Sequence, residues 1–150
     1  MKKKPLFSGC GLLVIISLLG SAFFGWAMFG ENEVYVSGAS SHRLAPPAAR
    51  EINYYERRNI SGVVSITYVV GEREFRNFAE SQGWTLERQA QGPSGVIASS
   101  PEAWANGTMN HHDSKIGECL FYEMRHANGG GIAVIYDLAA SRATINQASR

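Results

Sequence analysis

Cysteine is scarce in this chain of 150 residues, which has only Cys10 and Cys119. A framework of several disulfides, which small secreted domains use to compensate for a limited core, is therefore excluded. We expect Cys119 to be a partly buried residue that packs as a small apolar side chain. The alternatives for this cysteine are an intermolecular disulfide and a reactive thiol.

Sequence motifs that identify enzymes are missing as well. The chain has no CxxC, HxH or HExxH spacing for a metal, no GxGxxG or P-loop pattern for a nucleotide, and no nucleophile elbow. The glycine run 129–131 precedes a segment with the pattern of a strand, which indicates a turn rather than a phosphate loop. The leading interpretation is a protein without catalytic residues, cofactor or metal.

An excess of positive charge is missing from most of the chain. After residue 30, eleven basic residues stand against thirteen acidic ones, so this part has a net charge of −2. Binding to nucleic acid requires a basic surface, and nucleic acid is therefore not an expected partner. The same part is long enough for one domain with a core of its own.

The strongest feature that the sequence does have is an uncharged apolar run, Gly11–Gly30, which follows the three lysines Lys2–Lys4. Twenty residues in a helix match a hydrocarbon core of roughly 30 Å. Basic residues stay on the cytoplasmic side of a membrane, and acidic residues follow this run. We therefore predict a single-pass membrane protein with residues 1–10 in the cytoplasm, residues 11–30 as a signal-anchor in the bilayer, and the remainder extracytoplasmic.

Three alternatives concern the same region. A secretory signal peptide cleaved near Ala27 would give a secreted product, but its apolar part is usually shorter than this run. Cys10, next to the membrane, is a candidate for palmitoylation. Ser17, Ser21 and Gly25 recur every four residues, so they define a small-residue face through which two anchors could form a homodimer.

Beyond the apolar run, composition separates a linker from a folded domain. Residues 31–50 contain small residues and the pair Pro46-Pro47, which are typical of an extended spacer. Residues 51–150 predict an α+β domain, in which a mostly antiparallel sheet of about five or six strands has one helix, about 72–82, packed on one face. The expected strands are 52–55, 62–70, 84–88, 96–99, 118–126, 132–137 and 143–147, of which 84–88 and 96–99 have weak patterns.

Residue patterns also predict where these elements lie. In the strand 62–70, alternation places Ile66 and Tyr68 on the core face together with Val64 and Val70. The strand 143–147 is less hydrophobic and is therefore expected at an edge of the sheet. Residues 100–115 are polar and are expected to be irregular.

A recognition patch is the leading functional prediction for the domain. Tyr54, Tyr55, Arg57 and Arg58 combine aromatic rings with guanidinium groups, a composition that is enriched at protein interfaces. The expected partner is an envelope or surface protein. The alternative for these residues is ordinary packing of tyrosines in a strand with arginines at its exposed end.

The alternative function is a small extracytoplasmic enzyme or metal-binding module in the region of His111, His112, Asp113 and Cys119. Imidazole and carboxylate groups are common metal ligands, and a thiol beside a histidine is a potential nucleophile. Adjacent histidines in an extended chain point in opposite directions, so this pair is poorly placed to bind one ion.

Overall fold

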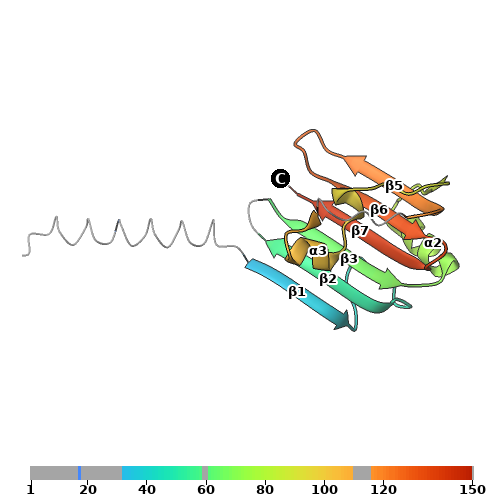
Figure 1. Cartoon of the computed structure of the whole chain (residues 1–150), viewed down its shortest axis with the longest axis horizontal. Coiled ribbons are helices and arrows are strands. Elements are labelled where there is room, and N and C mark those ends of the chain that lie inside the picture. Colours follow the sequence, from blue (N-terminus) through green and yellow to red (C-terminus); the bar gives the residue numbers. More distant parts are fainter. Residues whose placement is uncertain (1–16, 18–31, 59–60, 110–115, 150) are drawn as a thin grey trace, which may run out of the picture. The chain divides into compact units, whose positions relative to one another are not determined.

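The computed structural model describes residue 17 and residues 32–58, 61–109 and 116–149, and Asn32–Arg150 forms one compact unit. Within the described residues this unit contains a seven-stranded sheet of order β1-β2-β3-β7-β6-β5-β4 (Figure 1). All neighbouring strands are antiparallel, which confirms the predicted antiparallel α+β class, with more strands than expected. The elements are β1 (Asn32–Ala39), β2 (Arg50–Arg58), β3 (Val63–Val69), α2 (Glu72–Ser81), β4 (Glu87–Gln89), the 3-10 turn η1 (Val96–Ala98), α3 (Pro101–Ala105), β5 (Cys119–Arg125), β6 (Gly131–Asp137) and β7 (Arg142–Ala148).

Side chains alternate between the two faces of the sheet, and both faces are covered. On the face that we name the α2 face, the buried Ile66 and Tyr136 belong to one apolar cluster with Phe75 of α2. On the opposite face, which we name the α3 face, Ile135 packs with Ala98 of η1. The helix α3 contacts β2 and β3 on this second face. The sheet is therefore a middle layer with a cover on each side.

The helix α2 forms where the periodicity of the sequence predicts it. Its buried Phe75 stacks on Tyr136 with ring centroids 4.5 Å apart, and the phenolic oxygen of Tyr136 donates a hydrogen bond to the carbonyl of Val70 at 2.9 Å. The helix ends at Ser81, and the chain turns away at Gly83, whose φ of +74° few side chains tolerate. Trp84 then donates its backbone N–H to the carbonyl of Ala79 at 2.9 Å.

The strand β7 lies in the middle of the sheet, between β3 and β6, which corrects the prediction that residues 143–147 form an edge strand. Its polar residues indicated contact with water, yet Asn146 is only 8 % exposed. The second layer, η1 and α3, buries this residue and supplies its hydrogen-bond partners. Strand β3, with buried residues on both faces, confirms the predicted core positions Ile66 and Tyr68.

The second layer was not predicted. Residues 96–99, expected as a weak strand, form the 3-10 turn η1 after Gly95, which has a φ of +80°. Residues 100–115 were expected to be irregular, but Pro101–Ala105 is a short helix. The Ser100 hydroxyl accepts a hydrogen bond from the N–H of Ala103 at 3.3 Å, and proline occupies the first turn, so this helix starts with two favourable signals.

The predicted linker, residues 31–50, is largely part of the folded unit. Asn32–Ala39 pairs with β2 as the first strand of the sheet, and the loop that follows buries Leu44 in the apolar cluster of the α2 face. We therefore place Asn32–Ala39 in the sheet rather than in a spacer. Val34, Tyr35 and Val36 are only three consecutive apolar residues, and a pattern this short does not distinguish a strand from a spacer.

The predicted anchor Gly11–Gly30 lies outside the described residues except for Ser17, and so do Cys10, Ser21, Gly25 and Ala27. Among the residues that the structure does describe, no helix combines the length and hydropathy needed to cross a bilayer.

Candidate functional site

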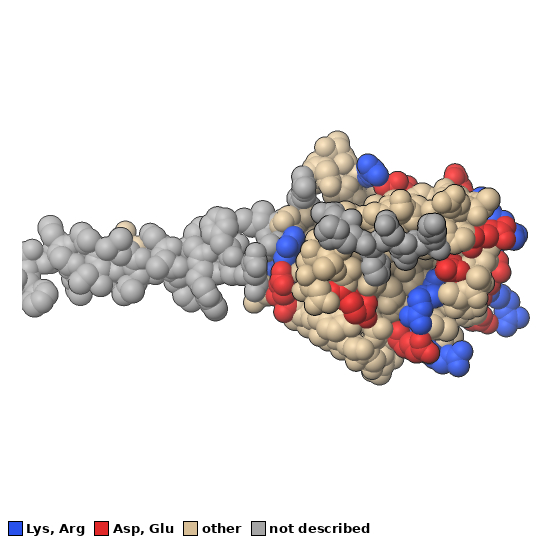
Figure 2. All heavy atoms as spheres, viewed as in Figure 1, with Lys and Arg blue, Asp and Glu red and all other residues tan. Residues whose placement is uncertain are grey.

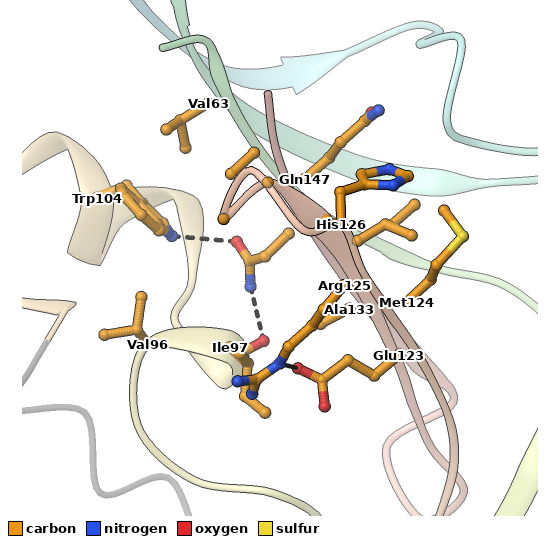
Figure 3. A pocket seen from close by; sticks show the side chains of 16 residues that line it. Val63, Val96, Ile97, Trp104, Glu123, Met124, Arg125, His126, Ala133 and Gln147 are labelled. Atoms are coloured by element: carbon orange, nitrogen blue, oxygen red, sulfur yellow. Dashed lines mark hydrogen bonds and ion pairs between the residues drawn. The ribbon is translucent and has the colours of Figure 1, made fainter. Parts of the chain in front are cut away.

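A cleft of about 290 Å³ opens at the end of the sheet where β7 ends and β6 begins. The turn η1 and the helix α3 form one wall, and the end of β5 with the following turn, which includes His126 and Gly129, forms the other (Figure 3). We name this space the interface cleft. It is a natural place to look for function because concave sites between elements are where proteins bind ligands.

The polar groups of Asn146 and Trp104 inside the interface cleft already have protein partners. The Asn146 side chain accepts a hydrogen bond from the indole Nε1 of Trp104 at 3.0 Å and donates to the carbonyl oxygens of Ile97 and Ser99 at 2.9 and 3.1 Å. Trp104 also stacks on the buried Tyr55, with ring centroids 6.3 Å apart. Since these polar groups are satisfied, the cleft presents mainly apolar surface to a ligand.

Apolar surface is exposed on the α3 side of this cleft, where Val96 is 42 % exposed and lies next to Ile97. Met124 is 41 % exposed and also borders the cleft, but it pairs with Ile132, so its side chain lies on the α2 face. At its edge, Arg125 donates from Nε to the carboxylate of Glu123 at 2.6 Å. An apolar centre with a charged edge is the usual anatomy of a protein interface.

A second cavity, of about 250 Å³, lies nearer the other end of the α3 face and is polar. Its charged groups are engaged within the protein, because Glu102 accepts a hydrogen bond from Tyr35 at 2.8 Å and Arg142 binds Glu51 at 2.8 Å. Asp137 accepts hydrogen bonds from two backbone N–H groups of the turn that follows it. The charged groups of this cavity therefore belong to hydrogen bonds and ion pairs that stabilise the fold.

A third cavity, of about 180 Å³, lies beside the end of β2. We name it the arginine pocket, because the described residues that line it include Arg43, Arg57 and Arg58, with Glu56 as the acidic residue among them. The face shown in Figure 2 has acidic and basic side chains intermixed.

The carboxylate of Glu56 belongs to a partly buried cluster. It lies 3.2 Å from Nε2 of His42 and accepts a hydrogen bond from Arg58 at 2.9 Å. Burial alone would raise the pKa of Glu56, but the hydrogen bonds from Arg58 and His42 outweigh it and lower that pKa below its ordinary value. Burial lowers the pKa of His42 despite the neighbouring carboxylate, so this imidazole is neutral at pH 7.

Two of the residues that line this pocket have a buried side-chain atom without a hydrogen-bond partner, namely Nε of Arg57 and Oε1 of Gln147. The terminal nitrogen of Arg57 is 4.0 Å from the carboxylate of Glu33, its partner residue on β1. A buried polar atom without a partner costs free energy.

The predicted recognition patch is divided by the structure. Tyr54 packs on the ring of His42 at 4.8 Å, whereas Tyr55 lies on the opposite face and is 3 % exposed. Neighbouring residues in a strand point to opposite faces, so the two tyrosines do not form one surface. Arg57 and Arg58 both border the arginine pocket, but their side chains also point to opposite faces, since Arg57 lies with Glu33 and Arg58 lies with Glu56.

The alternative catalytic or metal site has less support in the described residues. Cys119 is fully buried against Ala98 and Ile135, and burial raises the pKa of its thiol, which disfavours the reactive thiolate. His111, His112 and Asp113 lie outside the described residues. In the part of the chain that the structure describes, no three His, Cys, Asp or Glu side chains are grouped as a metal site would require.

Several residues of these sites were missed at the sequence level. His42 and Arg43 lay in the predicted linker, and Trp104 and Asn146 are 42 residues apart, so no local pattern joins them. The available signal was Ser100-Pro101, which marks the start of a helix and hence a second layer.

Comparisons with protein families, with curated proteins and with solved structures find no match for this chain.

Proposed function

We propose that this chain is a single-pass membrane-anchored protein whose extracytoplasmic domain is a non-catalytic binding module. The uncharged run Gly11–Gly30 after Lys2–Lys4 supports the anchor and its orientation. The buried thiol of Cys119 and the hydrogen-bonded side chain of Asn146 in the interface cleft support binding rather than catalysis.

The interface cleft is the proposed binding site, and its occupant is an apolar side chain of a partner protein. The observation that carries this proposal is Val96, a large apolar residue that is 42 % exposed and lines the cleft beside Ile97 and Trp104 on the α3 face. A volume of about 290 Å³ lies at the small end of the range for whole ligands, which is roughly 300–1,000 Å³. It suits a single anchoring side chain of the kind that dominates the energy of protein interfaces.

Site-specific photo-crosslinking in native membranes tests this proposal. A benzophenone amino acid is placed at Val96 or at Arg125, which is 76 % exposed at the edge of the cleft, and the matched control carries it at Arg73, which is 86 % exposed on α2. We expect the same partner band from both cleft positions and none from the control. The substitution Val96→Asp, introduced together with the crosslinker at Arg125, is expected to remove that band, because it places a charge at the apolar wall.

Equal crosslinking from all three positions, or a band that persists in the Val96→Asp chain, would contradict the proposed site. Membrane topology is tested separately with Arg73→Cys and a membrane-impermeant maleimide on intact cells. This exposed thiol is expected to react from outside, whereas Cys10 reacts only after the membrane is opened. Cys119 is unsuitable as the reporter because its side chain is buried.

A further inference from the structure

We propose that the outer edge of β1 pairs with the same edge of a second copy of this chain, so that two sheets join into one across a two-fold axis. This inference goes beyond the proposed function, because it does not involve the interface cleft. Three observations carry it: a long strand at the edge of the sheet, exposed apolar side chains on that strand, and a sequence that complements itself in an antiparallel pair.

The two edges of the sheet differ in how they are protected. At one edge, β4 has only three residues, all of them polar or charged, and such short edge strands resist pairing with another chain. At the other edge, β1 has eight residues and contains no lysine, arginine or proline, the residues that commonly block such pairing. In the part of the chain that the structure describes, the outer backbone groups of β1 have no partner strand.

Apolar surface is concentrated on this edge strand. Four large apolar side chains are exposed among the described residues, and two of them, Val34 and Tyr35, are consecutive on β1. Val34 is 49 % exposed. Tyr35 is 42 % exposed, although its hydroxyl donates a hydrogen bond to the carboxylate of Glu102 at 2.8 Å. A further strand beside β1 would remove part of this apolar surface from water, which favours association.

A second copy of β1 is the occupant that this edge fits. A two-fold axis at Tyr35 places Val34 of each copy opposite Val36 of the other, and Tyr35 opposite its own copy. Each of these apolar residues then faces an apolar residue, and such cross-strand pairs stabilise a sheet. Glu33 is the only charged residue of β1 and lies opposite Ser37 of the other copy, so the two carboxylates do not oppose each other.

The dimer is compatible with the rest of the fold. The pairing of β1 with β2 runs without a shift over Asn32–Val36, so the strand is regular at the proposed axis. Opposite residues of an antiparallel pair point to the same face, and the α3 faces of the two copies therefore lie on one side of the joined sheet. None of the described residues that line the interface cleft belongs to β1. The dimer would thus present two open interface clefts on the same side.

Single cysteines in the full chain test this register in native membranes. Cys10 is replaced by serine, the buried Cys119 is kept, and one cysteine is placed at Glu33, Tyr35 or Ser37. Only the residue on the axis lies opposite its own copy, with Cα atoms about 4.5–5.5 Å apart, which a disulfide can bridge. The copies of the other two positions are offset by four residues, or roughly 14 Å. Under mild oxidation we expect a linked dimer from Tyr35→Cys and not from Glu33→Cys or Ser37→Cys.

The strength of the contact is measured on the full chain in a neutral detergent, by native mass spectrometry over a range of protein concentrations. The substitution Val34→Lys places a charge in an apolar pair twice in each dimer, and we expect it to raise the dissociation constant on the order of tenfold or more. The matched control Val96→Lys places the same charge at an exposed apolar residue of η1 and is expected to leave the dimer unchanged. Thermal unfolding of each variant checks that it is folded.

Four results would overturn the proposal. The first is a chain that stays monomeric at every concentration, and the second is equal disulfide formation from all three cysteine positions. The third is a dimer that Val34→Lys does not weaken more than Val96→Lys, because its contact would then lie outside β1. The fourth is a disulfide from Tyr35→Cys to a different protein without any linked dimer, which would give the edge another occupant. The proposed function is tested separately, by photo-crosslinking at the interface cleft.

Discussion

The two faces of the sheet are covered in different ways. The α2 face is closed by stacked aromatic and aliphatic side chains, with Phe75 on Tyr136 as its centre. The α3 face instead buries polar side chains, namely Ser65, Thr67, Ser99 and Asn146. Apolar packing adapts to small changes of shape, whereas a buried polar network is stable only when every partner is in place. We therefore expect the side-chain positions to be fixed more strictly on the α3 face than on the α2 face. The turn η1 and the helix α3 on this face also form one wall of the interface cleft.

The largest expected effect is on the α2 face, from Phe75→Ala. This change removes a fully buried ring from the apolar cluster and leaves a cavity, so we expect the free energy of unfolding to fall by about 3–5 kcal/mol. Urea denaturation followed by circular dichroism measures it. The similarly placed but half-exposed Phe78 is the control, and a loss for Phe75→Ala no larger than for Phe78→Ala would show that α2 is not the main cover of this face.

The next effect is on the α3 face, from Asn146→Ala. The side chain makes three hydrogen bonds, and its removal leaves the Trp104 indole and the carbonyl of Ile97 without a partner. We expect a loss of about 2 kcal/mol together with weaker crosslinking from Val96. A double-mutant cycle with Trp104→Phe is expected to give a coupling of about 1 kcal/mol. Additive losses would show that the two side chains do not act as one network.

A smaller effect concerns acidification, to which the two faces should respond differently. The lowered pKa of His42 means that the unfolded chain binds a proton first, so stability is expected to decrease as pH falls below the ordinary value of 6.5. Glu56 adds a further loss at lower pH, since its stabilising contribution is present above its ordinary value of 4.5 and is lost as pH falls through its lowered pKa. His42→Gln is expected to flatten the upper part of this curve. Urea denaturation between pH 8 and pH 5 measures it, and an unchanged slope would exclude His42.

The smallest effect is expected from the exposed ion pair on α2. Arg76 lies 2.7 Å from Glu72 at i,i+4 spacing, with both side chains about half exposed. We expect Arg76→Gln to cost roughly 0.3–0.5 kcal/mol, and less in high salt, because water and ions screen the pair. Unfolding measured at low and high salt tests this. A loss comparable to that of Asn146→Ala would show that surface charge matters as much as the buried network.

The contrast between the faces also explains how much of the fold could be predicted. The α2 face follows from local periodicity: the strand 62–70 and the helix 72–82 each have their buried residues at the spacing that their geometry requires. The central place of β7 could not be predicted in this way. Its polar residues are buried by η1 and α3, which come from a distant segment of the chain. No pattern within residues 143–147 indicates this burial.

The candidate sites show the same limit. Arg57 and Arg58 were identified from composition, and both residues border one cavity at the end of β2, although their side chains contact Glu33 on one face and Glu56 on the other. Arg43 and His42 reach the same place only through the fold of residues 40–49, which composition assigned to a spacer. The tyrosines were assigned to the same patch because composition ignores the alternation of side chains along a strand.

The pairing of β1 with β2 has a mechanical consequence under the proposed anchor. Asn32 and the interface cleft lie at the same end of the sheet, because Arg57, beside the partner of Asn32, pairs with Val63, and Val63 pairs with Ala148. A partner held in the cleft would therefore load the chain between two points of one row across the strands. The hydrogen bonds between β1 and β2 also run across the strands, so the force would open them one after another, starting at Asn32. The first strand of the sheet would then be the part of the domain that yields first under tension.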